Sequence, residues 1–228
     1  RGGIWDGNYA NNNSGLVESD PTSPLAGVQG DTNFINVTGL RIIDARFINC
    51  NGFCVQFVGT GAVFRDLYVD TPRDFIHING PSSNIVIERC YGFSADAFVA
   101  LNAWDWHISG PTVGDIADVR IRNCAYYGSN QGGRTGIFVV FLSGTRSTST
   151  GQGVGNVRDV TVDGFAIDMS KGSVTPASVG FSVTLDYDQV QGSEFAGVGL
   201  GENIKISNGY IKSANSNNAG LAFLKTAS

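Results

Sequence analysis

The sequence contains few of the residues that build helices, metal sites or surfaces for polyanions. Its 228 residues include one Met, two His, and 15 Lys plus Arg against 20 Asp plus Glu, for a formal net charge of −5. An acidic chain is a poor partner for nucleic acid, whose phosphates are neutralised by Lys and Arg. No apolar run is long enough to span a bilayer. We therefore expect neither nucleic acid nor a membrane as a partner.

Two His and the absence of a Cys-x-x-Cys pair also give no metal-binding pattern, so no metal and no cofactor are predicted. The sequence is instead rich in Gly, with 31 residues, and in Asn, Ser and Thr, which favours turns and strands.

A short unit recurs along the chain: a turn residue, then an apolar, any and an apolar residue. The copies are Gly39–Ile42, Asp66–Val69, Asn84–Ile87, Asp118–Ile121, Asp159–Val162 and Asn203–Ile206. Apolar residues with period two are typical of strands with one buried face. Asp, Asn and Gly before each strand suit a tight turn, because they tolerate a left-handed backbone.

A second apolar strand follows each copy. The series is Val55–Phe57, Ile76–Ile78, Val99–Leu101, Val139–Phe141, Val183–Leu185 and a weaker Leu221–Phe223. The early spacing predicts coils of about 22 residues, a repeat length typical of solenoids, and the spacing grows later in the chain. Such self-similarity predicts an all-β, right-handed, single-stranded parallel β-helix, one domain over residues 1–228 with longer loops on one edge. A β-sandwich does not repeat one turn–strand unit in this way. The opening, Arg1–Asn8, reads like the interior of a fold, so we expect a fragment of a longer chain.

Three of the four cysteines follow apolar strands in similar contexts. Cys50, Cys90 and Cys124 are predicted to stack as a ladder of buried free thiols, which behave as small apolar groups. A disulfide between stacked cysteines is the alternative, and the cellular compartment stays open.

Two aspartates precede adjacent strands of the second series. Asp74 and Asp96 are separated by one predicted coil, and neighbouring strands lie about 4.7–4.9 Å apart. Paired carboxylates push their pKa values apart, which leaves one as a proton donor and one as a base or nucleophile. The alternative is that both aspartates cap turns.

The segment after Leu101 carries aromatic and titratable residues. Trp104 and Trp106 alternate and are expected to stack on sugar rings, although one of them is also expected to fill the core. Asp105 and His107 are candidate assistants in catalysis. The full set of predicted sugar contacts is Trp104, Trp106, Arg73, His77, Arg134, Tyr187, Asp186 and Asp188. Loops 143–156 and 186–202 are expected to wall a groove that suits a polymer.

At these residues the sequence resembles the pectin-lyase-like β-helix superfamily, and most closely its polygalacturonase-like glycoside hydrolases. Gly2–Asn8 is similar to the family's opening motif. Thr71–Asp74 falls where the family has Asn-Thr-Asp, and Ser94–Ala97 where it has an Asp-Asp pair. The resemblance implies a polysaccharide substrate, with Asp74 and Asp96 as catalytic carboxylates.

The sequence also departs from that family. Ala95 replaces an Asp, no His lies near Gly133–Gly136, and no basic residue stands at Ser182–Thr184. These losses argue against pectin as the substrate. The chain is also similar to phage tailspike depolymerases, which implies an extracellular or virion-tail location and a homotrimer. A polysaccharide lyase and a non-catalytic adhesive solenoid stay open as alternative functions.

Overall fold

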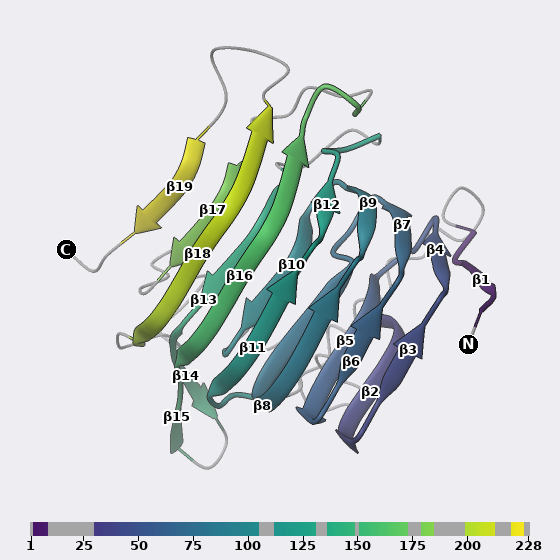
Figure 1. The fold of residues 1–228 in the computed structure, drawn as a ribbon. Helices are drawn as coiled ribbons and strands as arrows, with labels where there is room; N and C mark the ends of the chain where they lie inside the picture. Colours follow the sequence, from purple (N-terminus) through teal and green to yellow (C-terminus); the bar gives the residue numbers. More distant parts are fainter. Residues whose placement is uncertain are drawn as a thin grey trace.

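The computed structural model describes residues 2–8, 30–104, 112–130, 136–148, 151–172, 179–184, 199–212 and 220–225. Within these ranges, seventeen strands form one continuous sheet in which every strand pairing is parallel, and the antiparallel hairpin of β14 (Gly144–Thr148) and β15 (Gly151–Gly155) stands apart from it. The described ranges contain no helix. The strands stack along one axis from β1 to β19 (Figure 1). The parallel β-helix predicted from the sequence is confirmed.

The chain turns three times in each coil, and this divides the sheet into three faces. Face 1 contains β2 (Gly30–Thr38), β5 (Phe53–Thr60), the start of β8 (Ile76–Glu88), β10 (Ala97–Asn102), β13 (Ile137–Leu142), β17 (Val179–Thr184) and β19 (Gly220–Lys225). Face 2 contains β3 (Arg41–Ile43), β6 (Val63–Arg65), the end of β8, β11 (Ile116–Arg122) and the starts of β16 (Val157–Asp168) and β18 (Gly201–Lys212). Face 3 contains β1 (Ile4–Asp6), β4 (Arg46–Ile48), β7 (Tyr68–Thr71), β9 (Tyr91–Ser94), β12 (Ala125–Tyr126) and the ends of β16 and β18.

The first repeat series lies on face 2, with one exception. Ile85 pairs with Val119, Val119 with Val160, and Val160 with Ile204, as the pattern predicts. The assignment of Asp66–Val69 to this series was wrong, because Tyr68 pairs with Arg46 on face 3. The face 2 strand of that coil is β6. All six predicted turn residues have a left-handed backbone, with φ between 51° and 76°.

The second series lies on face 1. Val55 pairs with Ile76, and Ile76 pairs with Val99, as the early spacing predicts. Val99 then pairs with Val139, a much longer step along the chain, so a constant coil length does not describe this protein. Val139 pairs with Phe181 rather than with the Val183 that the pattern predicted.

A column of aromatic rings fills the interior of the solenoid. Phe75, Phe98, Phe138, Phe165 and Phe181 follow one another with ring centroids 5.2–5.7 Å apart. Stacked, tilted and edge-to-face contacts of this kind stabilise by about 0.5–1.5 kcal/mol per pair beyond the area they bury. The column ties successive coils together along the axis.

The cysteine ladder was wrong at one position. Cys50 forms a disulfide with Cys54, with their Cα atoms 5.4 Å apart. Cys90 and Cys124 are free and buried on adjacent coils, as predicted. The hydrogen-bond register explains the error. The amide of Tyr91, the residue after Cys90, donates to the carbonyl of Leu67, so the residue of the preceding coil that is aligned with Cys90 is Leu67.

Candidate active site at the corner between faces 3 and 1

The predicted carboxylates lie where the chain leaves face 3 and enters face 1. We call this region the Asp74 corner, formed by residues 70–74, 94–97 and 128–130. Consecutive coils contact one another here: the amide of Ser94 bonds the carbonyl of Gly128, and the amide of Ala95 bonds the carbonyl of Thr71. The corner therefore places side chains from three coils next to each other.

Asp74 and Asp96 do not occupy equivalent places. Because Ile76 pairs with Val99, the coil is one residue longer here than the separation of the two aspartates. The residue aligned with Asp74 is Ala97, and the amide of Ala97 donates to Asp74 Oδ1 at 2.7 Å. Asp96 therefore lies one position away from the alignment that the sequence predicted.

Asp74 is a buried acceptor with both oxygens engaged. Besides the bond from Ala97, its Oδ2 lies 2.6 Å from His77 Nδ1. Asp74 is 5% exposed and His77 is 1% exposed. The Phe53 ring stacks on the imidazole with centroids 3.8 Å apart and planes 5° from parallel. Asp74 thus has the structural role of the capping alternative, because it binds the backbone amide at the start of the next coil's face 1 strand.

A chain of hydrogen bonds fixes the proton positions around His77. The amide of Gly30 can only donate, and it bonds Gln56 Oε1 at 3.3 Å. Gln56 Nε2 then donates to Asn79 Oδ1 at 2.9 Å, which leaves Asn79 Nδ2 facing His77 Nε2 at 3.3 Å. His77 Nε2 must therefore accept, and the ring proton sits on Nδ1 and is donated to Asp74. This arrangement makes His77 a positioning residue for Asp74.

Asp96 is half-buried and lies at the same corner. Burial of the Tyr126 hydroxyl raises the pKa of that phenol well above its ordinary value, and the negative charge of Asp96 raises it further. Tyr126 donates its hydroxyl proton to the carbonyl of Ser94 at 3.0 Å. The same register aligns Arg73 with Asp96. The contact that Arg73 makes at this corner is through its backbone, because its carbonyl accepts a hydrogen bond from Ser94 Oγ at 2.9 Å.

Asp70 is a carboxyl that the sequence reasoning missed. Burial raises its pKa, and a 3.3 Å bond from Asn130 Nδ2 to Oδ2 opposes the shift only in part. The other oxygen, Oδ1, is buried and has no hydrogen-bond partner among the residues that the structure describes. A half-buried carboxyl with a raised pKa can hold a proton and give it to a leaving group. Asp70 was missed because the register of face 3 cannot be read from the repeat alone.

Aromatic residues surround Asp70 on the outer side of face 3. Asp70 pairs with Phe93 on the next strand. Tyr68 and Tyr91 lie two residues before these, with ring centroids 5.4 Å apart, and Tyr91 is 44% exposed. Arg46 covers the Tyr68 ring at 4.8 Å. The corner thus offers aromatic surface next to a protonatable group.

The remaining predicted site residues are either buried or outside the described part of the chain. Trp104 is 1% exposed and packs against Gly144, where an added Cβ would lie 1.8 Å from the indole nitrogen. It fits the alternative in which one tryptophan fills the core. The predicted site residues that lie outside the described residues are Asp105, Trp106, His107, Arg134, Asp186, Tyr187 and Asp188.

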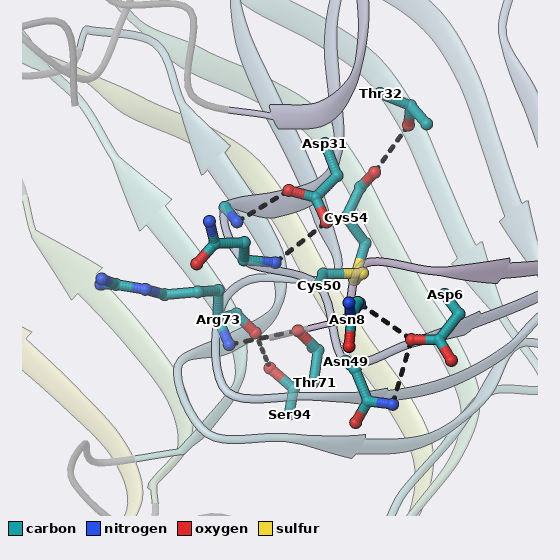
Figure 2. The surroundings of a disulfide bond; sticks show 12 residues. Asp6, Asn8, Asp31, Thr32, Asn49, Cys50, Cys54, Thr71, Arg73 and Ser94 are labelled. Atoms are coloured by element: carbon teal, nitrogen blue, oxygen red, sulfur yellow. Dashed lines mark hydrogen bonds between the residues drawn. A yellow bond between two sulfur atoms is a disulfide. The ribbon is translucent and has the colours of Figure 1, made fainter. Parts of the chain in front are cut away.

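The disulfide between Cys50 and Cys54 lies in the coil next to Asp74, where the amide of Cys54 donates to the carbonyl of Asp74 (Figure 2). The carboxylate of Asp31 accepts from the amides of Asn51 and Gly52, both at 2.9 Å, inside the loop closed by Cys50 and Cys54. The Arg73 side chain points away from the disulfide in this view.

The described residues contain no group of three or more His, Cys, Asp or Glu that is arranged to hold a metal ion. Among these same segments, none forms a helix long and apolar enough to cross a membrane.

Comparisons with known proteins find similar structures only. No protein-family model matches the chain, and no curated protein sequence matches it. An endo-xylogalacturonan hydrolase from Aspergillus tubingensis aligns with 86% of this chain and 68% of its own, at 14% identity and a TM-score of 0.40. The catalytic domain of a GH87 α-1,3-glucanase in complex with nigerose aligns with 84% of this chain and 49% of its own, at 11% identity and a TM-score of 0.33. Similarity at these values assigns no residue, activity or substrate to this chain.

Proposed function

We propose that this chain is a polysaccharide-degrading glycoside hydrolase that acts at the Asp74 corner. The observation that carries the proposal is Asp70: a half-buried carboxyl with a raised pKa, set among aromatic side chains, with a buried oxygen that no described residue hydrogen-bonds. Hydrolysis of a glycosidic bond needs a proton donor for the leaving oxygen and a second carboxylate for water or the sugar carbon.

In this proposal Asp70 is the proton donor and Asp96 the second carboxylate. Asp96 is half-buried, whereas Asp74 is 5% exposed and has both oxygens engaged. Asp74 and His77 then act as positioning residues that hold the coil carrying Asp96 through the amide of Ala97. This assignment keeps Asp96 from the sequence prediction and replaces Asp74 with Asp70 as its partner carboxyl group, with Asp70 as the acid.

The aromatic residues beside Asp70 would receive the sugar. A pyranose ring presents C–H groups on its faces, and these pack on aromatic surface such as the exposed ring of Tyr91. The polar groups of Asn130 and Arg46, at the edge of the same surface, would then bond to hydroxyl groups. The tailspike role, the extracellular or virion location and the homotrimer remain predictions from the sequence resemblance.

A product assay separates this function from its two alternatives. Wild-type protein is incubated with a panel of bacterial capsule, O-antigen and wall polysaccharides, and reducing ends and ultraviolet absorbance are followed together. Hydrolysis predicts new reducing ends without absorbance. A new C=C absorbance would instead indicate a lyase, and retention of a polysaccharide without any product would indicate the adhesive function.

A further inference from the structure

A groove follows the junction of faces 1 and 2, on the opposite edge of face 1 from the Asp74 corner. It encloses about 370 Å³ and is lined by residues of five successive coils. Thr38 pairs with Thr60, Thr60 with Ser83, Ser83 with Ala117, and Ala117 with Arg158, so these residues form one row along the axis. With strands about 4.8 Å apart, the row is roughly 19 Å long.

The row presents hydroxyl groups in fixed positions. Thr60 Oγ1 and Ser83 Oγ lie 3.0 Å apart, and Asn84 Nδ2 donates to Thr60 Oγ1 at 3.4 Å. Next to the row, the buried Ser82 donates its hydroxyl proton to the carbonyl of Asn79 at 2.6 Å. Side chains that are already ordered lose little conformational freedom when a ligand binds.

The groove stays open because small residues line its floor. Gly59 has φ of 149°, and an added Cβ would lie 2.0 Å from the carbonyl oxygen of Val37, so a larger residue is excluded. Ala117 stands near the middle of the row. A larger residue in place of Ala117, which lines the groove, would fill the space that a ligand needs.

A charged pair closes one end of the groove. Arg158 Nε lies 3.7 Å from Asp115 Oδ2, and both side chains are more than 40% exposed. Asn156 holds the other oxygen of Asp115 with its amide at 3.1 Å and its side-chain Nδ2 at 2.9 Å. The two charges cancel, while both groups can still bond to hydroxyl groups.

We propose that this groove binds a neutral polysaccharide chain lying along the solenoid axis, separately from the reaction. A long, hydroxyl-lined groove of zero net charge fits an extended polymer of neutral sugars. A polyanion such as nucleic acid would place its charge against Asp115 and against a protein of net charge −5. The proposal shares only the ligand class with the proposed function, and none of its residues takes part in the hydrolysis.

Affinity electrophoresis tests the proposal directly. The intact chain is run through gels that contain dextran, laminarin or galactomannan, and its retardation gives an apparent Kd. We expect at least one polymer to retard the wild type and Ala117→Trp to weaken that binding roughly tenfold or more, the loss of about one or two well-made contacts. Arg120→Trp, three residues along the same strand and outside the groove, is the matched control and should bind as the wild type does.

A second pair of variants, with smaller changes in side-chain shape, tests the groove even if Ala117→Trp does not fold. Thr60→Val removes one groove hydroxyl with little change in shape and should weaken binding, whereas Thr161→Val on the same face should not. Asp70→Asn should leave retardation unchanged, so a failed hydrolysis assay and a failed binding assay are distinguishable. Retardation of Ala117→Trp and Thr60→Val equal to the wild type, or no retardation of the wild type in any of the three gels, would overturn the proposal.

Discussion

Asp74 Oδ2 and His77 Nδ1 lie 2.6 Å apart, and both side chains are buried. Together with the bond from the amide of Ala97, this contact leaves Asp74 with no free oxygen at the corner. A residue fixed in this way stabilises the junction of two coils, and its substitution should affect folding before it affects turnover.

The first prediction follows from the two acceptor oxygens of Asp74. Asp74→Asn replaces one acceptor with an NH2 donor, which cannot accept from His77 or from Ala97. Leaving a buried donor unpaired costs about 1–3 kcal/mol, so we expect the free energy of unfolding in urea to fall by that amount. Asp96→Asn, half-buried at the same corner, should change it by less than about 1 kcal/mol. Equal stability of Asp74→Asn and wild type would contradict the hydrogen-bond assignment.

The second prediction concerns a buried carboxylate on face 2. Glu88 is 4% exposed and pairs with Arg65 and with Arg122, whose Nη2 lies 2.6 Å from Glu88 Oε2. Burial alone would raise the pKa of Glu88, but the hydrogen bond and charge of Arg122, with Arg65 and Arg89, lower it below its ordinary 4.5. Since the folded-state pKa is the lower one, this stabilisation is complete above about pH 4.5 and is lost as the pH falls through the folded-state pKa.

Glu88→Gln should therefore destabilise the fold at pH 7 by about 1–3 kcal/mol and flatten the loss of stability below pH 4.5. Urea titrations at pH 7 and pH 3.5 measure both effects. Glu202→Gln, an exposed residue of face 2, is the control and should show neither. A Glu88→Gln protein as stable as the wild type at pH 7 would show that the three arginines gain nothing from this carboxylate.

The third prediction concerns the thiols. In protein unfolded without reductant, an alkylating reagent should label Cys90 and Cys124 and leave Cys50 and Cys54 unlabelled. In the folded protein Cys90 should react slowly, because burial raises the pKa of its thiol. Mass spectrometry of the labelled peptides reads the pattern, and labelling of all four cysteines without reductant would rule out the disulfide.

The fourth prediction uses the raised pKa of Asp70. Its raised pKa means that folding favours the protonated form, so its contribution to stability is present at low pH and is lost as the pH rises through the folded-state pKa. Asp70→Asn removes the charge and should keep or raise stability at pH 7, by up to about 1 kcal/mol. Thermal unfolding at pH 7 measures this. A clearly less stable variant would mean that the ionised carboxyl has a structural partner.

The β-helix could be predicted from the sequence because each part of the turn–strand unit has a physical explanation. Left-handed residues such as Asn84 and Asp118 recur before apolar strands, and only a stacked coil buries each strand on the next. The alignment of the corner residues could not be predicted, because coil lengths vary and a one-residue shift changes which side chains meet. Asp74 and Asp96 were therefore predicted to be equivalent, while Asp70 was missed.

The cysteines illustrate the same limit. The contexts of Cys50 and Cys90 look alike in sequence, yet the residue that stacks below Cys90 is Leu67. The disulfide between Cys50 and Cys54 closes a bend within one coil, a contact that repeat periodicity does not report.

The most direct test of the proposed function is the initial rate of reducing-end release by matched amounts of folded protein, on a polysaccharide that the wild type cuts. Asp70→Asn and Asp96→Asn should each lower the rate by at least about 10²-fold, the usual scale for a general acid or base. Asp118→Asn, at a turn residue whose side chain is 43% exposed and whose φ of 53° Asn also tolerates, should cut at the wild-type rate. If Asp70→Asn and Asp96→Asn also cut at the wild-type rate, the Asp74 corner is not the active site.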